Sequence, residues 1–202
     1  NLTIQNTAGK VGQAVALHVE ADRSVFKNCN LVGNQDTLYA ANEKSRQLYI
    51  NCFIEGTTDF IFGEATALFK KCIIKSLSDS YITAAATTKR QHYGFVFDSC
   101  RLTSSPAVHK VYLGRPWRPY ANVVFFHTWM GAHIRPEGWH NWGNKENEKT
   151  AFYAEYDNQG PGADISGRVG WVRSSKNLTK KDIKKYSLQQ ILGGNDHWSP
   201  LN

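Results

Sequence analysis

Short segments of one form recur along the first two thirds of the chain: alternating apolar residues, then a cysteine, then another apolar residue. The four segments are VFKNCNLVG (25–33), LYINCFIEG (48–56), LFKKCIIKS (68–76) and FVFDSCRLT (95–103). Their cysteines lie 23, 20 and 28 residues apart, and VVFFHTWMG (123–131) has Thr128 at the cysteine position a further 28 residues on. One strand pattern per repeat at such an irregular period predicts an all-β parallel β-helix whose turns differ in loop length.

The cysteine positions are expected to line the interior of this solenoid, because inward-facing side chains of stacked turns form ladders. A disulfide between neighbouring turns is one option, and spacing alone leaves the pairing open. None of the four cysteines forms a C-x-x-C pair, which argues against a zinc ribbon or a thioredoxin-like site.

The sequence changes character at about residue 136, where stretches rich in Gly, Asn and Pro predict loops. Residues 178–192 read as an amphipathic helix, with Thr179 as its cap and Gly193 after its end. We therefore expect one domain over residues 1–202, with β-helix coils over 1–135. Residues 136–202 would form long loops and a short C-terminal helix that covers the end of the solenoid.

Two aspartates occupy the same register in successive repeats. Asp36 lies seven residues after Cys29, and Asp59 lies seven residues after Cys52. In stacked turns these carboxyl groups would lie about 5 Å apart, close enough for one pKa to rise while the other carboxylate stays ionised. Asp79 also follows a cysteine by seven residues, so the spacing alone selects three acids, and two exposed loop acids remain the plainer reading.

The surroundings of the first two aspartates favour them as a catalytic pair. Gln35 precedes the first aspartate and Gln13 lies about one turn upstream, where their amides can stabilise an oxyanion. Arg115 in YLGRPW can hold a carboxylate through two parallel hydrogen bonds. Trp117 and Trp139 offer flat faces for sugar rings, although a tryptophan is more often part of a core or a loop anchor.

Composition excludes several other classes of protein. The net charge of +7 at pH 7 favours a polyanionic partner without naming it. No RNP or helix-turn-helix pattern occurs, so we expect no nucleic-acid binding. The sequence has no run of about 18 apolar residues, so we expect no membrane-spanning helix. The sequence also lacks the G-x-S-x-G, H-E-x-x-H, P-loop and G-x-G-x-x-G motifs, and its seven histidines show no metal-ligand spacing.

Four motifs in order, GQAVALH, GNQDTLY, TTDFIFGEA and YLGRPW, give the chain a strong resemblance to the pectin methylesterases. The resemblance runs from NLTIQNTAG at the start through EGWHNW and FYAEYDNQGPGAD to the C-terminal region. It implies a right-handed parallel β-helix with neither a metal nor another cofactor. It also implies that Asp59 is the nucleophile and Asp36 the general acid and then base. Gln13 and Gln35 would stabilise the oxyanion, Arg115 would hold Asp59 and orient the galacturonate, and Trp117 and Trp139 would line the sugar groove.

The implied reaction is hydrolysis of the C6 methyl ester of galacturonate units in pectin, which yields pectate and methanol. The resemblance further implies a monomer that is secreted to the cell exterior or cell wall, binds pectin and has a proteinaceous inhibitor as a second partner. Cys52 and Cys72 match positions that plant members join by a disulfide. His18, Asn34 and the AANEKS insertion depart from the plant pattern and suggest a bacterial-type branch, and the absent G-x-Y-x-E motif suggests missing N-terminal turns.

Two rival readings remain open. A calcium-dependent β-helix enzyme resembling the pectate lyases would need an acidic cluster beyond the aspartate pair. A pectin-binding module without activity would keep the groove and have no need of the five polar residues named above.

Overall fold

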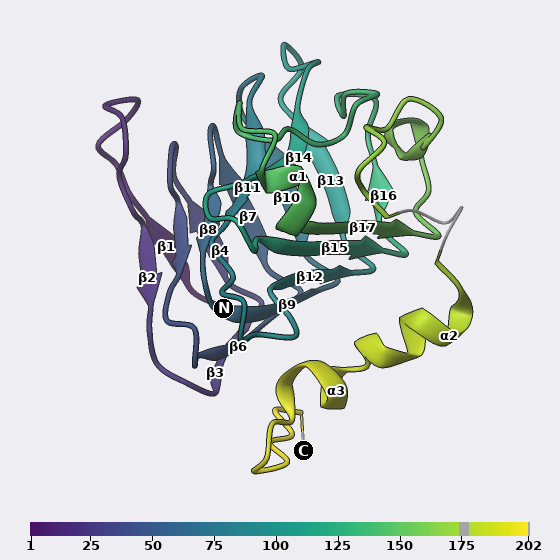
Figure 1. Cartoon of the computed structure of the whole chain (residues 1–202). Coiled ribbons are helices and arrows are strands. Elements are labelled where there is room, and N and C mark those ends of the chain that lie inside the picture. Colours follow the sequence, from purple (N-terminus) through teal and green to yellow (C-terminus); the bar gives the residue numbers. More distant parts are fainter. Residues whose placement is uncertain (174–177, 202) are drawn as a thin grey trace.

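The computed structural model describes residues 1–173 and 178–201, and three parallel β-sheets dominate it (Figure 1). The first sheet contains β1 (Thr3–Gln5), β4 (Asn30–Val32), β7 (Phe53–Gly56), β10 (Ile73–Ser76), β13 (Arg101–Ser104) and β16 (Trp129–Met130). The second contains β2 (Leu17–Val19), β5 (Leu38–Ala40), β8 (Ile61–Gly63), β11 (Tyr81–Ala85) and β14 (Tyr112–Pro116). The third contains β3 (Ser24–Lys27), β6 (Arg46–Ile50), β9 (Thr66–Lys70), β12 (Phe95–Asp98), β15 (Asn122–Phe126) and β17 (Phe152–Tyr156).

The chain visits the three sheets in turn, so consecutive strands lie in different sheets and each strand pairs with its equivalent one turn away. Each complete turn thus adds one strand to every sheet. The predicted all-β parallel β-helix is confirmed, and its period follows the cysteine spacing of the sequence.

A sharp bend separates the third sheet from the first in every turn. The residue at each bend has a positive φ, between 51° and 56°, and lies immediately before a cysteine or Thr128; these residues are Asn28, Asn51, Lys71, Ser99 and His127. Non-glycine residues rarely adopt this left-handed region, so its recurrence at one register shows that the bend geometry is common to all of these turns.

The cysteines after these bends line the interior, as expected, but they do not pair. All four are buried free thiols, and the disulfide expected between Cys52 and Cys72 is wrong for this structure. The physical reason is that the thiols of Cys52 and Cys72 are each directed at a backbone carbonyl of the preceding turn. Cys52 Sγ donates to Phe26 O at 3.4 Å, and Cys72 Sγ donates to Tyr49 O at 3.4 Å.

Aromatic rings stacked along the axis fill the core beside the third sheet. Tyr49, Phe69, Phe97 and Phe125 follow one another with ring centroids 4.8, 4.5 and 4.2 Å apart. All four are fully buried. Such stacking fixes the register of neighbouring turns, which makes the solenoid a rigid support for side chains on the second sheet.

The region after residue 135 differs in part from the loops and single helix expected. β17 adds a further strand to the third sheet, so the coils continue past that boundary. The helical segment is broken into α2 (Lys180–Ile183), a 3-10 turn (Lys184–Tyr186) and α3 (Leu188–Leu192), while α1 (Asn147–Thr150) lies in the preceding loops. Thr179 caps α2 as predicted, in a reciprocal pair of hydrogen bonds with Asp182.

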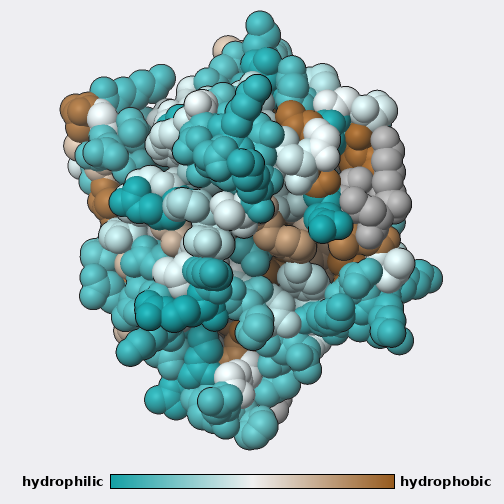
Figure 2. Space-filling view, in the orientation of Figure 1, coloured by the Kyte–Doolittle hydropathy of each residue, from teal (hydrophilic) through white to brown (hydrophobic). Residues whose placement is uncertain are grey.

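The C-terminal helices cover the side of the solenoid rather than its end (Figure 1). Ile191 and Leu192 pack on Leu48, Leu68 and other outward-facing apolar residues of the third sheet. The expectation that this segment covers the solenoid's end is therefore wrong, because the apolar outer face of the third sheet is what it buries. Figure 2 shows a largely hydrophilic surface, with apolar residues gathered where the C-terminal segment meets the solenoid.

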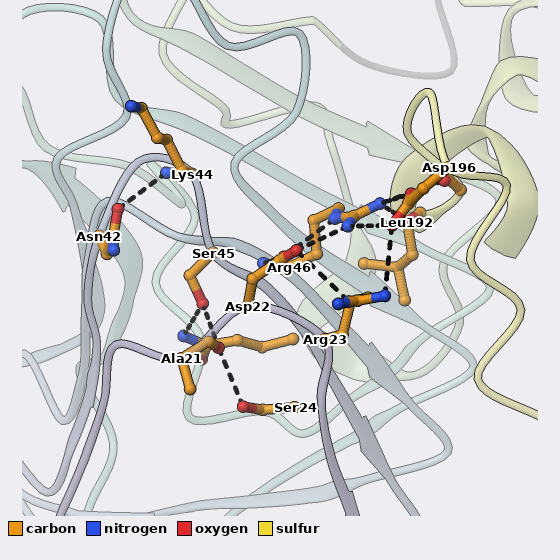
Figure 3. Close-up of polar contacts among 12 residues, drawn as sticks. Ala21, Asp22, Arg23, Ser24, Asn42, Lys44, Ser45, Arg46, Leu192 and Asp196 are labelled. Carbon is orange, nitrogen blue, oxygen red and sulfur yellow. Dashed lines mark hydrogen bonds and ion pairs between the residues drawn. The ribbon is translucent and has the colours of Figure 1, made fainter.

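A network around Arg46 fastens the C-terminal segment to the early turns (Figure 3). The guanidinium donates to the backbone carbonyls of Leu192 and Gly193, both at 3.1 Å, and forms ion pairs with Asp22 at 2.6 Å and Asp196 at 2.5 Å. One side chain thus joins residues about 150 positions apart in sequence. Among the described residues, no helix has the length and apolar character needed to cross a membrane.

Candidate active site

The two aspartates selected by register lie side by side at the start of the second sheet. β5 and β8 pair with Leu38 opposite Ile61, which places Asp36 opposite Asp59 on the neighbouring turn. Both residues have a positive φ, 64° and 49°, and both are buried, with exposed fractions of 6% and 5%. Strained backbone at two facing acids is typical of a functional site.

Asp79, the third acid with the same cysteine spacing, lies elsewhere. β10 pairs with β7 at an offset of 20 residues, but β11 pairs with β8 at an offset of 22, so Tyr81 lies beside Asp59 where the spacing suggested Asp79. Asp79 instead accepts hydrogen bonds from the backbone N–H groups of His109, at 2.7 Å, and Lys110, at 2.9 Å. These bonds lower the pKa of its carboxyl group, as expected for a loop anchor.

Arg115 holds Asp59 through two hydrogen bonds. Its Nε donates to Oδ1 at 3.0 Å, and its Nη2 donates to Oδ2 at 2.6 Å. Arg115 on β14 lies opposite Ala84 on β11. The preceding residue, Gly114, lies opposite Thr83, and only a glycine fits there because an added Cβ would lie 2.0 Å from Thr83 Oγ1. Burial raises the pKa of the Asp59 carboxyl group, and the guanidinium opposes that rise.

Asp36 has the properties of a proton donor and acceptor. Burial, and then the negative charge of Asp59, raise the pKa of Asp36 to about 6, while a hydrogen bond from Gln13 and the charge of Arg115 act in the opposite direction. A carboxyl group with this pKa can both give and take a proton near neutral pH. The two aspartates thus differ in environment, one being held by a cation and the other lacking such a partner.

The predicted amides lie beside the aspartates. Gln13 and Gln35 form a parallel bridge on adjacent turns, and both line the same cleft as the acids. Their amide N–H groups are close enough to the acids to serve the cleft, and their stabilisation of a developing negative charge stays a prediction.

A cleft of about 420 Å³ joins these groups. It is lined by Gln13, Val15, Gln35, Asp36, Tyr39, Asp59, Phe62, Ala84, Arg115, Trp117 and Trp142. The structure therefore brings together all five polar residues selected from the sequence, and Trp117 with them. The lining aromatic residues give the cleft flat apolar faces beside its polar centre, as sugar-binding sites require.

Trp139 is not at the cleft, and its predicted contact with sugar is wrong. The side chain is only 1% exposed, its Nε1 donates to Glu155 Oε1 at 2.9 Å, and it stacks on Tyr153 with centroids 4.2 Å apart. It is the loop anchor that the sequence also allowed. Trp142, three residues later, lies at the cleft and is 38% exposed.

Sequence reasoning missed Trp142, Tyr39 and Phe62. A signal for Trp142 was available, because it precedes Gly143 in an Asn-rich loop, where a large side chain is not needed for the core. Tyr39 and Phe62 follow the two aspartates by three residues each and stack on one another at 4.5 Å. Strand alternation places them on the outer face of β5 and β8.

The residues that the structure describes contain no group of three or more His, Cys, Asp or Glu side chains arranged to hold a metal ion. Those residues therefore contain no acidic cluster of the kind that a calcium-dependent enzyme would need.

Comparisons with known proteins agree with the motifs. The pectinesterase family model matches residues 1–195. Pectinesterase 31 of Arabidopsis thaliana is 47% identical over 175 residues, which cover 86% of this chain and 55% of that protein. The putative pectinesterase 11 of the same plant is 40% identical over 98% of this chain and 55% of its own length. The chain thus spans about half the length of these curated relatives.

Solved structures give the same picture. Carrot pectin methylesterase is 34% identical, with a TM-score of 0.88 over 96% of this chain and 64% of that one. The Erwinia chrysanthemi enzyme PemA is 29% identical, with a TM-score of 0.77 over 98% of this chain and 69% of that one. Because identity is higher to the plant proteins, these comparisons do not support the bacterial-type branch that the sequence suggested.

Proposed function

Because the chain belongs to the pectinesterase family, we propose that it hydrolyses the C6 methyl esters of galacturonate units in pectin. The products are pectate and methanol. One observation carries the proposal: two buried aspartates lie opposite one another in a cleft, Asp59 held by Arg115 and Asp36 with a pKa of about 6. This pairs a positioned nucleophile with a group able to move protons.

In the first half of the reaction, ionised Asp59 attacks the C6 carbonyl carbon of a methyl-esterified galacturonate. The carbonyl oxygen becomes an oxyanion, which Gln13 and Gln35 stabilise by hydrogen bonding. When the tetrahedral intermediate collapses, the bond to the methoxy oxygen breaks and Asp36 donates its proton to that oxygen. Methanol departs, leaving an acyl-enzyme anhydride and an ionised Asp36.

In the second half, Asp36 acts as a base. It takes one proton from a water molecule that attacks the anhydride, which releases the galacturonic acid group and restores ionised Asp59. The released acid then loses the second proton of that water to solvent and becomes a carboxylate. Asp36 ends protonated, as it began, so the cycle closes without a redox step or a second substrate. A pKa near 6 suits a group that must release and recover one proton in each turnover.

The surface around the cleft supports a polymeric substrate. A hollow of about 870 Å³ shares Tyr39 and Trp117 with the cleft, and a smaller one of about 240 Å³ shares Gln35. Depressions that share lining residues with a central site suit an extended chain of sugars. The positive net charge of the protein suits a substrate that becomes more anionic with each ester removed.

Action outside the cell or in the cell wall, a monomeric state and binding by a proteinaceous inhibitor stay predictions. In support of the last, several relatives carry names such as "Probable pectinesterase/pectinesterase inhibitor 21". A purified inhibitor of the pectinesterase class, added to an active preparation of this chain, tests that partner.

The test of the proposed function measures methanol and acid release from highly methylated pectin in the presence of EDTA. The proposal expects release by the wild-type chain and its loss in Asp59→Ala. Release that EDTA abolishes would favour the calcium-dependent alternative. Pectin binding without any release would favour the binding module.

A further inference from the structure

Trp142 has an unusual backbone conformation for a large aromatic residue. Its φ is +62°, in the left-handed region that L-residues rarely occupy. Such strain persists only where surrounding contacts impose it. Here Trp142 N–H donates to His140 Nδ1 at 3.0 Å, and the next amide, that of Gly143, donates to Asn141 Oδ1 at 2.9 Å. The loop itself therefore fixes this strained residue.

This loop is fastened to the strand that carries Arg115. His140 N–H donates to Gly114 O at 3.1 Å, and Trp139 bridges to the same glycine. The His140 ring packs against Tyr81 and Tyr112, with centroids 5.6 and 5.4 Å away. These contacts fix the loop that carries Trp142 to β14 at Gly114, the residue before Arg115.

The conformation places the Trp142 ring on the guanidinium of Arg115. Arg115 Cζ lies 3.7 Å from the Trp142 ring centroid, and Tyr81 covers it at 4.0 Å. Two rings at such short distances restrict the plane of a guanidinium. The edge of the group is then free to donate, and two of its N–H bonds reach the carboxylate of Asp59.

We propose that Trp142 is a positioning residue: held by His140, it clamps Arg115 against Tyr81 and so keeps the two hydrogen bonds of Arg115 on Asp59. The inference rests on the proposed function for its catalytic consequence, but the clamp itself concerns only residues of this chain. It assigns to His140 and Trp142 a role distinct from contact with sugar.

The protonation state of His140 is part of the clamp. Its Nδ1 accepts a hydrogen bond, so this nitrogen carries no proton. Burial lowers the pKa of His140, and the positive charges of Arg115 and Arg135 act in the same direction. The titratable side chains whose rings pack on it are Tyr81 and Tyr112. The acceptor is therefore available across neutral pH.

Burial raises the pKa of Asp59, and the hydrogen bonds and charge of Arg115 lower it. The charge of Asp59 in turn raises the pKa of Asp36 on the neighbouring turn. The buried hydroxyl of Tyr153 also feels the Asp59 charge. Loss of the Trp142 ring exposes one face of Arg115 and lets it leave Asp59, while Asp59 itself stays buried. The pKa of Asp59 then rises, because burial is no longer opposed as strongly.

The experiment compares Trp142→Ala with Trp117→Ala, a second cleft tryptophan that lies over Arg118 instead. Trp142→Ala is expected to lower kcat about 10- to 100-fold and to move the acid limb of the kcat profile to higher pH. Trp117→Ala is expected to raise KM without moving that limb. Trp142→Phe, which keeps a ring over Arg115, is expected to recover most of kcat.

Carboxyl carbon NMR of Asp59 reads the clamp without any substrate. The titration should move to higher pH in Trp142→Ala and in His140→Leu, and should stay near the wild-type position in His140→Asn, whose Oδ1 replaces the acceptor. An unmoved titration with only KM raised would overturn the proposal and make Trp142 a sugar contact. If the wild type releases no methanol, the proposed function fails, whereas the NMR result still decides the clamp.

Discussion

Replacement of Asp36 by asparagine is expected to stabilise the fold at neutral pH while it abolishes activity. In the folded protein, burial and the charge of Asp59 raise the pKa of Asp36 from 3.8 to about 6. Below pH 3.8 the residue is protonated in both the folded and unfolded states. Between pH 3.8 and 6 the unfolded chain ionises first, so the folded state loses stability as the pH rises. Asparagine cannot ionise and avoids this loss.

The size of the effect follows from the shift. A rise of about two pKa units corresponds to about 3 kcal/mol above pH 6, at 1.36 kcal/mol per unit. Asparagine also replaces a hydrogen-bonded carboxylate, so we expect a net gain of about 1 to 3 kcal/mol at pH 7. For a chain of this size that is about 2 to 12 °C in Tm.

The assay is thermal and urea unfolding of wild type and Asp36→Asn at pH 4, 5, 6, 7 and 8. The difference in unfolding free energy should be small at pH 4, grow through pH 5 and level off above pH 6. Asp79→Asn is the matched control, because backbone N–H groups lower the pKa of Asp79 and its loss should destabilise the protein at neutral pH. Equal gains at pH 4 and pH 7, or no gain at either, would refute the reasoning.

Three further substitutions test other parts of the structure. Arg115→Lys keeps the charge but cannot make both hydrogen bonds to Asp59, so kcat/KM for methanol release should fall about 100-fold or more. Arg168→Met leaves Glu155 buried without its ion-pair partner and should cost about 3 to 5 kcal/mol in urea unfolding; a cost under about 1 kcal/mol would contradict this. Arg46→Ala removes the bonds to the C-terminal segment, so trypsin should cleave between residues 180 and 185 faster than in wild type, with the solenoid core intact on a gel.

Local repeats in the sequence predict the fold well because each turn of a solenoid contacts mainly its neighbours. The cysteine and Thr128 positions mark the same bend in successive turns, and this register is enough to bring Asp36 and Asp59 together. The same rule fails for Asp79, because two extra residues before β11 shift the pairing. Register is thus informative only where the intervening loop keeps its length.

The remaining errors concern packing that no local pattern records. Trp139 and Trp142 lie three residues apart in one loop, and only the partners in the fold, Glu155 for one and Arg115 for the other, distinguish the anchor from the cleft residue. The C-terminal helices similarly cover the side of the solenoid because the third sheet has an apolar outer face, which is visible only after its strands are assembled.

The central claim is that Asp36 and Asp59, and no other acid of the same spacing, carry out ester hydrolysis. The most direct measurement compares methanol release from highly methylated pectin by Asp36→Ala, Asp59→Ala and Asp79→Ala, each first shown to be folded. The account predicts losses of about 1,000-fold or more in the first two and near wild-type release by the third. Substantial release by Asp59→Ala, or an equal loss in Asp79→Ala, would contradict it.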